Sequence, residues 1–243
     1  MKLCSAQIQA IKGDIEGNIQ KHINFINLAA ENGAELIFFP ELSLTGYEPK
    51  LAKNLATTQE DKRFDIFQEI CDTKQLIICV GVPTKQSMGI AISMVIFQPH
   101  IPRQTYSKQI LHSDEYPYFV GGDNQVFISF NNHQIAPAVC FESLQMTHST
   151  NASANGANIY LASVAKSAKG IEKAKVHYPE IAKNLSMTVM MSNSIGIADD
   201  FLSVGNSAVW NNEGVLVTQL EQFEEAILIY DTETKSSQFY YFN

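Results

Sequence analysis

The sequence predicts an α/β domain in which helices flank strands. Strand and helix patterns alternate along the first third of the chain, and short strand patterns dominate the remainder. The chain has 243 residues, 45% of them hydrophobic, so it can bury a substantial core, and no linker or repeat divides it. We therefore expect a single domain over residues 1–243.

The first third has a β–α–β rhythm. Residues 3–8 alternate apolar and polar side chains, residues 14–32 carry apolar side chains at helical spacing, and residues 36–39 form a short apolar run. Asp14 is the expected N-cap of the helix and Gly33 its stop. A second helix is expected over residues 59–71, followed by a buried strand over residues 76–82.

The remaining predicted elements are mostly strands. We expect one helix over residues 171–187 and strands over residues 89–98, 104–106, 126–130, 134–139, 157–163, 190–195, 207–210, 215–219 and 226–231. Asn131-Asn132 and residues 211–214 are typical of hairpin turns. The tail, residues 232–243, contains the aromatic run 239–242, so we expect it to pack either at a subunit interface or on its own domain.

Charge and composition exclude several classes of protein. The net charge of −8 and the presence of only two arginines disfavour a nucleic-acid partner, because phosphate binding needs clustered basic side chains. No apolar run approaches the roughly 20 residues that span a bilayer. The N-terminus becomes polar too early for a signal peptide. These features predict a cytoplasmic protein without membrane contact.

Cysteine and histidine spacing predicts no metal centre. Cys4, Cys71 and Cys79 lie in apolar or helical patterns, and we expect them to be small buried hydrophobes. The four cysteines lack the short paired spacing of a disulfide framework or a zinc site, and no histidine pair has metal-ligand spacing. We expect neither a metal nor another cofactor.

Three reactive side chains each follow a predicted strand. Cys140 ends the apolar run 134–139, Glu41 follows Phe38-Phe39-Pro40, and Lys108 lies just after residues 104–106. Taken singly, these would be a buried structural cysteine, a solvated carboxylate and an exposed cation. Together, a carboxylate, an amine and a thiol on separate strand ends can supply a base, an electrophilic clamp and a nucleophile.

The three segments also resemble a known family. Phe-Pro-Glu-Leu-Ser-Leu-Thr-Gly-Tyr at 39–47, Tyr-Ser-Lys at 106–108 and Val-Cys-Phe-Glu at 139–142 resemble, in order, the signature blocks of the nitrilase superfamily, the carbon–nitrogen hydrolases. The resemblance extends from Lys2 to about Tyr230. It implies a four-layer αββα sandwich with Glu41 as general base, Lys108 as oxyanion stabiliser and Cys140 as nucleophile.

The resemblance also implies further residues of the site. Glu115, seven residues after Lys108, matches a second carboxylate that the family often carries, and we expect it to orient Lys108 or the substrate. The backbone N–H of Phe141 is the expected second oxyanion donor. Tyr47 resembles a pocket tyrosine of the family, although simple packing is an open alternative.

Two further residues remain open on sequence grounds. Lys166 lies where many family members have an aromatic residue, and it is either a substrate-facing charge or a solvated side chain. His112 is close in sequence to Lys108, so a Cys–His pair remains an alternative to the Glu-Lys-Cys set. Asn193 and Gly196 match a family Asn-x-x-Gly element, which we expect to be structural.

The family resemblance predicts a thiol-dependent hydrolase. Cys140 would attack a small amide or N-carbamoyl amine, and water would release the acid from the acyl-enzyme. A nitrile substrate or N-acyl transfer by the same residues remains an alternative. A non-catalytic oligomeric homologue is less expected because Glu41 and Lys108 are also present. A glutaminase feeding a fused synthetase is disfavoured because no second domain follows.

Assembly and substrate charge can be predicted only in outline. Family sandwiches pair across a two-fold axis, so we expect a homodimer or a higher homo-oligomer. The helix over residues 171–187 is one candidate interface element. Several carboxylates lie near the motif blocks with few arginines to balance them, which predicts a negative cleft and a neutral or cationic substrate tail.

Overall fold

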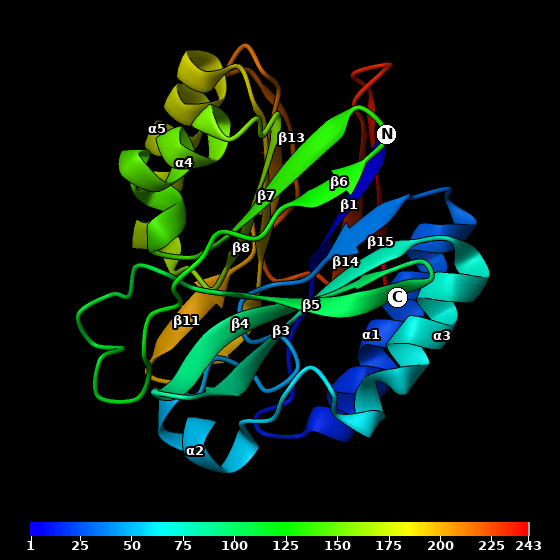
Figure 1. Cartoon of the computed structure of the whole chain (residues 1–243). Helices are drawn as coiled ribbons and strands as arrows, with labels where there is room; N and C mark the ends of the chain where they lie inside the picture. Colours follow the sequence, from blue (N-terminus) through cyan, green and yellow to red (C-terminus); the bar gives the residue numbers. More distant parts are fainter. Residues whose placement is uncertain (243) are drawn as a thin grey trace.

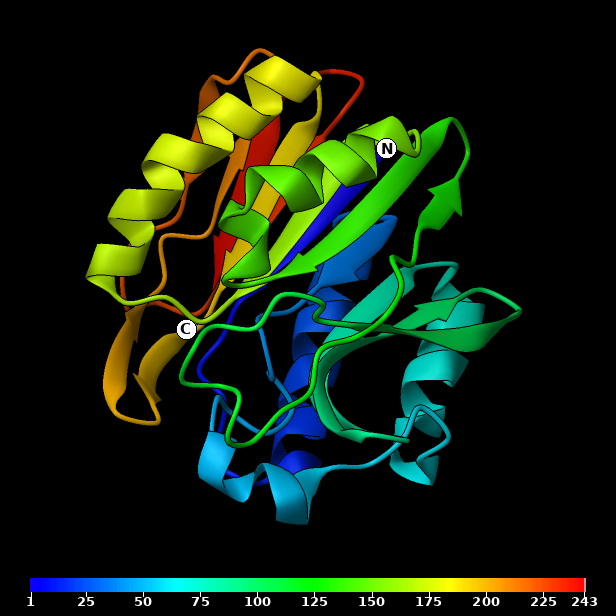
Figure 2. The same ribbon diagram turned by 60° about the vertical axis from the view of Figure 1, so that its left-hand side comes forward.

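A computed structural model describes residues 1–242, in which two β-sheets pack face to face between two layers of helices (Figure 1). One sheet has the strand order β15-β14-β1-β2-β3-β4-β5, and the other β13-β12-β9-β8-β7-β6. Helices α1 and α3 cover the outer face of the first sheet, and α4 and α5 cover the outer face of the second (Figures 1 and 2). The predicted four-layer αββα sandwich is confirmed.

The elements of the described chain have the following bounds. The first sheet is built from β1 (Lys2–Gln7), β2 (Leu36–Phe38), β3 (Ile77–Gln86), β4 (Gly89–Gln98), β5 (Ile101–Ser107), β14 (Ala226–Asp231) and β15 (Ser237–Tyr241). The second is built from β6 (Ile128–Phe130), β7 (His133–Val139), β8 (Ile159–Val164), β9 (Thr188–Asn193), β12 (Ala208–Trp210) and β13 (Leu216–Gln219). A separate hairpin joins β10 (Ile195–Ala198) and β11 (Phe201–Val204). The α-helices are α1 (Ile15–Glu31), α2 (Ala52–Leu55), α3 (Asp65–Lys74), α4 (Met146–Ala154) and α5 (Ala168–Leu185), with 3-10 turns at Pro49–Leu51, Lys62–Phe64 and Glu142–Leu144.

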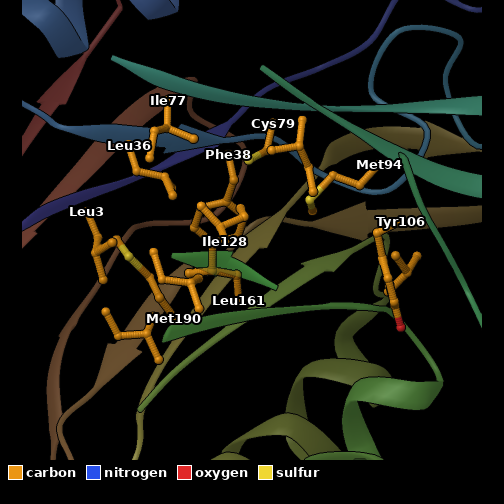
Figure 3. Close-up of a cluster of buried hydrophobic side chains, with 14 of the residues drawn as sticks. Leu3, Leu36, Phe38, Ile77, Cys79, Met94, Tyr106, Ile128, Leu161 and Met190 are labelled. Carbon is orange, nitrogen blue, oxygen red and sulfur yellow. The ribbon is translucent and has the colours of Figure 1, made fainter. Parts of the chain in front are cut away.

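The central core lies between the two sheets, because successive side chains of a strand point to opposite faces. In β2, Leu36 and Phe38 pack in this core, whereas Ile37 packs under the helices. Figure 3 shows the inner cluster, in which Leu3 and Phe38 of the first sheet meet Leu161 and Met190 of the second. The central strands of both sheets are therefore buried on their two faces.

The strand directions bring the ends of β2, β5 and β7 into one region. β2 runs parallel to β3, and two antiparallel pairings, β3 with β4 and β4 with β5, make β5 run the same way as β2. A hydrogen bond connects the two sheets at this end: the hydroxyl of Ser163 in β8 donates to the carbonyl of Phe39 at 2.7 Å. The carbonyl of Ser163 accepts the N–H of Cys140 at 3.0 Å. One serine therefore connects the end of β7 to the segment that follows β2.

Most predicted elements are present, with shifted ends. Asp14 caps α1 as expected, accepting the N–H of Gly17 at 3.0 Å. The helix expected over 59–71 was wrong at its start, because a 3-10 turn precedes α3 and α3 begins at Asp65. The strand expected over 190–195 runs instead from Thr188 to Asn193, since the chain turns there into the β10–β11 hairpin.

Helix α4, the β10–β11 hairpin and strand β15 were not predicted. α4 is rich in Thr, Ser, Asn and Ala, so it lacks the apolar periodicity that marks an amphipathic helix. β15 pairs antiparallel with β14, and Phe242 stacks on Phe25 of α1 with ring centroids 3.9 Å apart. The aromatic tail therefore packs on its own sheet and helix. The dimer and the single-domain organisation stay predictions.

No helix in the described part of the chain is both long and apolar enough to cross a bilayer. Over the same residues, no cluster of three or more His, Cys, Asp or Glu side chains is arranged to hold a metal ion.

Candidate active site

Glu41, Lys108 and Cys140 each lie just beyond a strand end, as predicted. Glu41 follows β2 by way of Phe39 and Pro40, Lys108 follows β5 directly, and Cys140 follows β7 directly. The side chain of Lys108 is fully buried, so the alternative of an exposed cation on a sheet edge is wrong. The three segments meet at the edge where the hydrogen bonds of Ser163 connect the two sheets.

Glu41 is held in a tight loop over β3. The loop packs so closely on Gly81 that a Cβ there would lie 2.5 Å from the carbonyl oxygen of Pro40 and 2.5 Å from the amide nitrogen of Leu42. Gly81 also donates its N–H to Ser43 Oγ at 3.1 Å. Leu42 has a φ of 52°, a left-handed conformation that costs energy for a non-glycine residue and is typical of functional sites. The glycine on β3 thus allows the loop to aim Glu41 inward.

The two oxygens of Glu41 have different surroundings. Oε1 accepts a hydrogen bond from Lys108 Nζ at 2.9 Å, whereas Oε2 has no partner among residues 1–242 although it is buried. Burial raises the pKa of Glu41 to about 7, against the lowering effect of the Lys108 charge. The raised pKa that proton transfer at neutral pH needs is therefore present, and one oxygen is free for a reacting group.

Lys108 lies between two carboxylates. Its Nζ donates to Glu41 Oε1 at 2.9 Å and to Glu115 Oε1 at 2.6 Å. Burial alone would lower the pKa of Lys108, but the negative charges of Glu41, Cys140 and Glu115 outweigh it and raise the pKa. The side chain is therefore a fixed cation. An ammonium has three N–H donors, so one remains after the two carboxylates are bound.

Glu115 and Tyr47 complete this arrangement. Glu115 is 2% exposed, and its Oε2 accepts the N–H of His112 at 2.8 Å. The hydroxyl of Tyr47 donates to Glu115 Oε1 at 3.1 Å. Burial and the charges of Glu41 and Glu115 raise the pKa of Tyr47, which keeps the phenol neutral and able to donate. The geometry agrees with an orienting role for Glu115 toward Lys108.

Cys140 occupies a strained turn at the mouth of a cavity. Its φ is 50°, again in the left-handed region, and its carbonyl accepts the hydroxyl of Ser143. Burial and the charge of Glu41 raise the pKa of Cys140 to about 11, although Lys166 and Lys108 lower it. At neutral pH the thiol is therefore protonated in the resting site and needs a base before it can attack.

The cavity beside Cys140 has a volume of about 500 Å³. Its lining includes five of the predicted site residues and a larger set around them: Tyr47, His112, Asp114, Glu115, Cys140, Phe141, Leu144, Gln145, Ala165, Lys166, Ser167, Gly170, Lys173, His177 and Phe201. Glu41 and Lys108 are buried beneath this lining. The cavity suits a small organic molecule, since pockets of a few hundred cubic ångströms bind such ligands.

Three other predicted residues have clear positions. The N–H of Phe141 has no acceptor within the described chain, so it is available as a donor next to the thiol. Lys166 is 5% exposed, which rules out the solvated alternative, and its Nζ lies 3.9 Å from Cys140 Sγ. His112 is half exposed at the cavity and bonds Asp114 rather than the thiol. The contacts therefore give no support to a Cys–His pair.

Several of the carboxylates on which the expected negative cleft rests have cationic partners. Glu48 pairs with Lys12 at 2.6 Å, and Asp199 pairs with Lys50 at 3.3 Å. Glu115 is paired with Lys108, as described above. The lining of the cavity carries both signs of charge, with Lys166 and Lys173 among its cations. Compensated carboxylates contribute less to the net potential, and a neutral or cationic substrate tail stays a prediction.

Glu142 is a site residue whose part the sequence did not reveal. It is fully buried two residues after Cys140, and its Oε1 accepts the N–H of Val139 at 2.7 Å. Its Oε2 accepts the N–H groups of Gln109 at 2.7 Å and Ile110 at 3.1 Å. One carboxylate therefore fastens the end of β7 to the segment after Lys108.

A chain of aromatic and imidazole groups supports Glu142. The hydroxyl of Tyr106 donates to Glu142 Oε1 at 2.7 Å and lies 2.9 Å from His148 Nε2. His148 Nδ1 lies 2.7 Å from the hydroxyl of Tyr160. Burial lowers the pKa of His148 in spite of Glu142, so this chain is a neutral support rather than a second charged site.

A model of the carbon–nitrogen hydrolase family matches residues 2–241. Among curated relatives, the glutamine-dependent NAD(+) synthetase of Acinetobacter baylyi is 25% identical, and the match covers 96% of this chain and 45% of that protein. The chain spans less than half the length of the curated relatives that it matches.

Solved structures give the same fold. The NitN amidase of Nesterenkonia sp. AN1 superposes with a TM-score of 0.87 at 22% identity, covering 95% of this chain and 92% of that one. A variant of that amidase in complex with butyramide has a TM-score of 0.86 at 21% identity, covering 94% of this chain and 89% of that one. These likenesses establish the architecture.

Proposed function

Because this chain belongs to the carbon–nitrogen hydrolase family, we propose that it cleaves the C–N bond of a small amide through a Cys140 acyl-enzyme. The observation that supports this most is the position of Lys108, whose buried ammonium lies between Glu41 and Glu115. A free carboxylate oxygen on Glu41 and a thiol at a cavity of about 500 Å³ complete the set. These are the groups that acyl transfer to a thiol requires.

In the first half of the reaction, Cys140 Sγ attacks the amide carbonyl carbon while its proton passes to Glu41. Glu41 is suited to this step, because a base with a pKa of about 7 is half ionised at neutral pH. The C–N bond then breaks, and the proton held by Glu41 leaves with the nitrogen as ammonia or an amine. The product that remains is a thioester on Cys140.

In the second half, water attacks the thioester carbon and gives a proton to Glu41. The C–S bond breaks, the carboxylic acid leaves, and the proton returns from Glu41 to sulfur. Glu41 thus acts twice as a base and twice as an acid, and no oxidant or metal enters the balance. The unpartnered Oε2 is the oxygen available for these transfers.

The oxyanion of each tetrahedral intermediate needs donors that are already in place. The remaining N–H of Lys108 Nζ and the free N–H of Phe141 are the two candidates. Preorganised donors of this kind are worth about 3–4 kcal/mol each when one is removed from an oxyanion hole. We propose that these two donors, on opposite sheets, hold the oxyanion.

Related reactions use the same residues. N-carbamoyl amines present a similar carbonyl carbon, a nitrile presents an electrophilic carbon, and N-acyl transfer replaces water by an amine. We propose amides as the first substrate class to test, because a variant of the amidase with the same fold has a solved structure in complex with butyramide. The discriminating experiment incubates the purified protein with matched amides, N-carbamoyl amines and nitriles and measures ammonia release. Ammonia from amides, lost in Cys140→Ala, is the expected result; release that persists in Cys140→Ala would contradict the proposal.

Glutamine is a second candidate substrate. The glutamine-dependent relative matches 96% of this chain, and the cavity lining carries Lys166 and Lys173 together with Asp114. Charges of both signs suit the ammonium and carboxylate of an amino acid. Comparing kcat/KM for glutamine with that for butyramide separates the two candidates. A large preference for glutamine would identify this domain as a glutaminase.

A further inference from the structure

Lys166 is a buried lysine with a fixed backbone. It follows β8 and is 5% exposed. Its N–H donates to Asn193 Oδ1 at 2.8 Å, and its carbonyl accepts from Asn193 Nδ2 and from the N–H of Val204, each at 3.2 Å. The Asn193 side chain, identified from the sequence only as structural, therefore clamps both backbone groups of Lys166.

The stem of Lys166 lies in a space that Gly170 leaves open. A Cβ at position 170 would lie 3.1 Å from Lys166 Cβ and 3.3 Å from Lys166 Cγ. Gly170 is in the first turn of α5, where a glycine has low helix propensity. The helix thus has a weak helix former at a position where a larger side chain would press on the Lys166 stem.

The ammonium of Lys166 has an unusual partner. Within residues 1–242 no carboxylate lies within ion-pair distance of its Nζ, and its hydrogen-bond partner is Cys140 Sγ at 3.9 Å. A buried charge is costly unless an opposite charge compensates it. This partner, the thiol, is a group that can become negative during the proposed reaction.

We infer that Lys166 is a second catalytic lysine, whose ammonium stabilises the thiolate of Cys140. The inference rests on the proposed function, in which Cys140 is the nucleophile. When Cys140 attacks, its proton passes to Glu41 and the sulfur electron pair forms the C–S bond. When that bond breaks, the pair returns to sulfur, and Lys166 stabilises the thiolate until Glu41 returns the proton. Lys166 keeps its own proton throughout.

The other charges around the thiol agree with different roles for Lys108 and Lys166. Lys108 is already paired with two carboxylates, so its field at the sulfur is largely offset. Lys166 lowers the pKa of Cys140 against burial and the charge of Glu41. The ionisable groups that face the thiol or line its cavity are Glu41, Tyr47, Lys108, His112, Asp114, Glu115, Lys166, Lys173 and His177. Of the lysines among them, Lys166 is the one in contact with sulfur.

Two alkylating agents of different charge test the inference. Iodoacetamide is neutral and iodoacetate is anionic, and both react with the thiolate of Cys140. Rates are measured by intact mass from pH 5 to 10 in the wild type, in Lys166→Met and Lys166→Gln, and in Lys169→Met. Lys169 is exposed in the first turn of α5, close in sequence to Lys166. Lys169→Met therefore removes one positive charge, as Lys166→Met does, and serves as the matched control. Cys4, Cys71 and Cys79 are buried and add little background.

Both agents should react about tenfold or more slowly with Lys166→Met and Lys166→Gln at pH 7, because one unit in the thiol pKa changes the thiolate fraction tenfold. The rate profile should move to higher pH, and Lys169→Met should match the wild type. Equal rates in wild type and Lys166 variants would overturn the inference. A loss confined to iodoacetate would also overturn it, and would make Lys166 an anchor for a substrate carboxylate. A wild-type Cys140 that neither agent modifies would instead contradict the proposed function.

Discussion

Glu142 Oε2 accepts the N–H of Gln109 at 2.7 Å, so the carboxylate that follows the nucleophile also fixes the segment that follows Lys108. Its other oxygen accepts the N–H of Val139 at the end of β7. Cys140 and Lys108 come from different sheets, and their relative position depends on this bridge. A carboxylate that accepts several backbone N–H groups is held by strong, charge-assisted hydrogen bonds.

Glu142→Gln should therefore weaken the fold and slow the reaction. The amide nitrogen cannot accept hydrogen bonds, which leaves at least one buried backbone N–H without an acceptor. The unfolding free energy should fall by about 1–3 kcal/mol, the usual cost of an unsatisfied buried donor. We expect kcat to fall more than KM rises, because the change misplaces the reacting groups. Urea unfolding and steady-state kinetics measure both effects.

Glu172→Gln is the matched control for this change. Glu172 is exposed on α5 and pairs only with Lys175, so the same substitution there should leave stability and kinetics nearly unchanged. If Glu142→Gln had as little effect as Glu172→Gln on the unfolding free energy and on kcat, the Glu142 bridge would not be needed to position Cys140 and Lys108.

The pH dependence of activity should report Glu41. Burial raises its pKa to about 7, and only the ionised form can accept the thiol proton. The value of kcat/KM for the best amide should therefore rise with pH and reach half of its plateau near pH 7. A rise centred near pH 4.5, the ordinary range of a glutamate, would show that another base acts.

Stability should show the opposite trend with pH. The folded protein binds the Glu41 proton more tightly than the unfolded chain, so ionisation of this group favours unfolding. Its contribution to the unfolding free energy should be present below about pH 4.5 and lost as pH rises through about 7. Subtracting the pH profile of Glu41→Gln isolates the effect. A difference profile that is flat or rises over this window would contradict the raised pKa.

Lys108→Ala should destabilise the protein as well as inactivate it. The change leaves the buried carboxylates of Glu41 and Glu115 facing each other without their cation. Breaking a buried ion pair from one side costs about 3–5 kcal/mol. Thermal and urea unfolding should show this loss, whereas Lys12→Ala, which breaks the half-exposed pair with Glu48, should cost about 1 kcal/mol or less. Equal losses of unfolding free energy in the two variants would show that the buried ion pairs of Lys108 stabilise the fold no more than the half-exposed pair of Lys12.

The sequence predicts the positions of the three reactive side chains because each follows a recognisable strand. Period-2 and apolar runs located β2, β5 and β7 within a few residues, and the side chains after them lie at one edge of the sandwich. The four-layer arrangement came from the family resemblance, since strand patterns alone do not state how two sheets pack.

What the sequence could not supply depends on contacts between distant segments. The bridge from Glu142 to Gln109 joins residues 33 positions apart, and the contact of Lys166 with Cys140 spans 26 positions. Neither pairing leaves a local pattern. The sequence also did not show that Lys12 pairs with Glu48 and Lys50 with Asp199, because the partners are remote from each other in sequence. Charge counted along a chain does not show which charges are paired.

Tyr47→Phe should have a modest effect through Glu115. It removes one hydrogen bond to Glu115 Oε1 and leaves the bond from Lys108 in place. A loss of about 1 kcal/mol in stability and a reduction in kcat of several-fold are expected. Tyr240→Phe removes a surface hydrogen bond to Gln238 and serves as the control. A change as severe as that of Lys108→Ala would mean that Tyr47 contacts the substrate directly.

The most direct measurement is the mass of Cys140 during turnover. The protein is mixed with the amide that releases ammonia fastest, quenched in acid at early times, digested, and analysed by mass spectrometry. The account predicts that the peptide containing Cys140 gains the mass of the acyl group, and that hydroxylamine removes it, as expected for a thioester. Ammonia release with Cys140 unmodified at every time point, together with undiminished turnover by Cys140→Ala, would contradict the account.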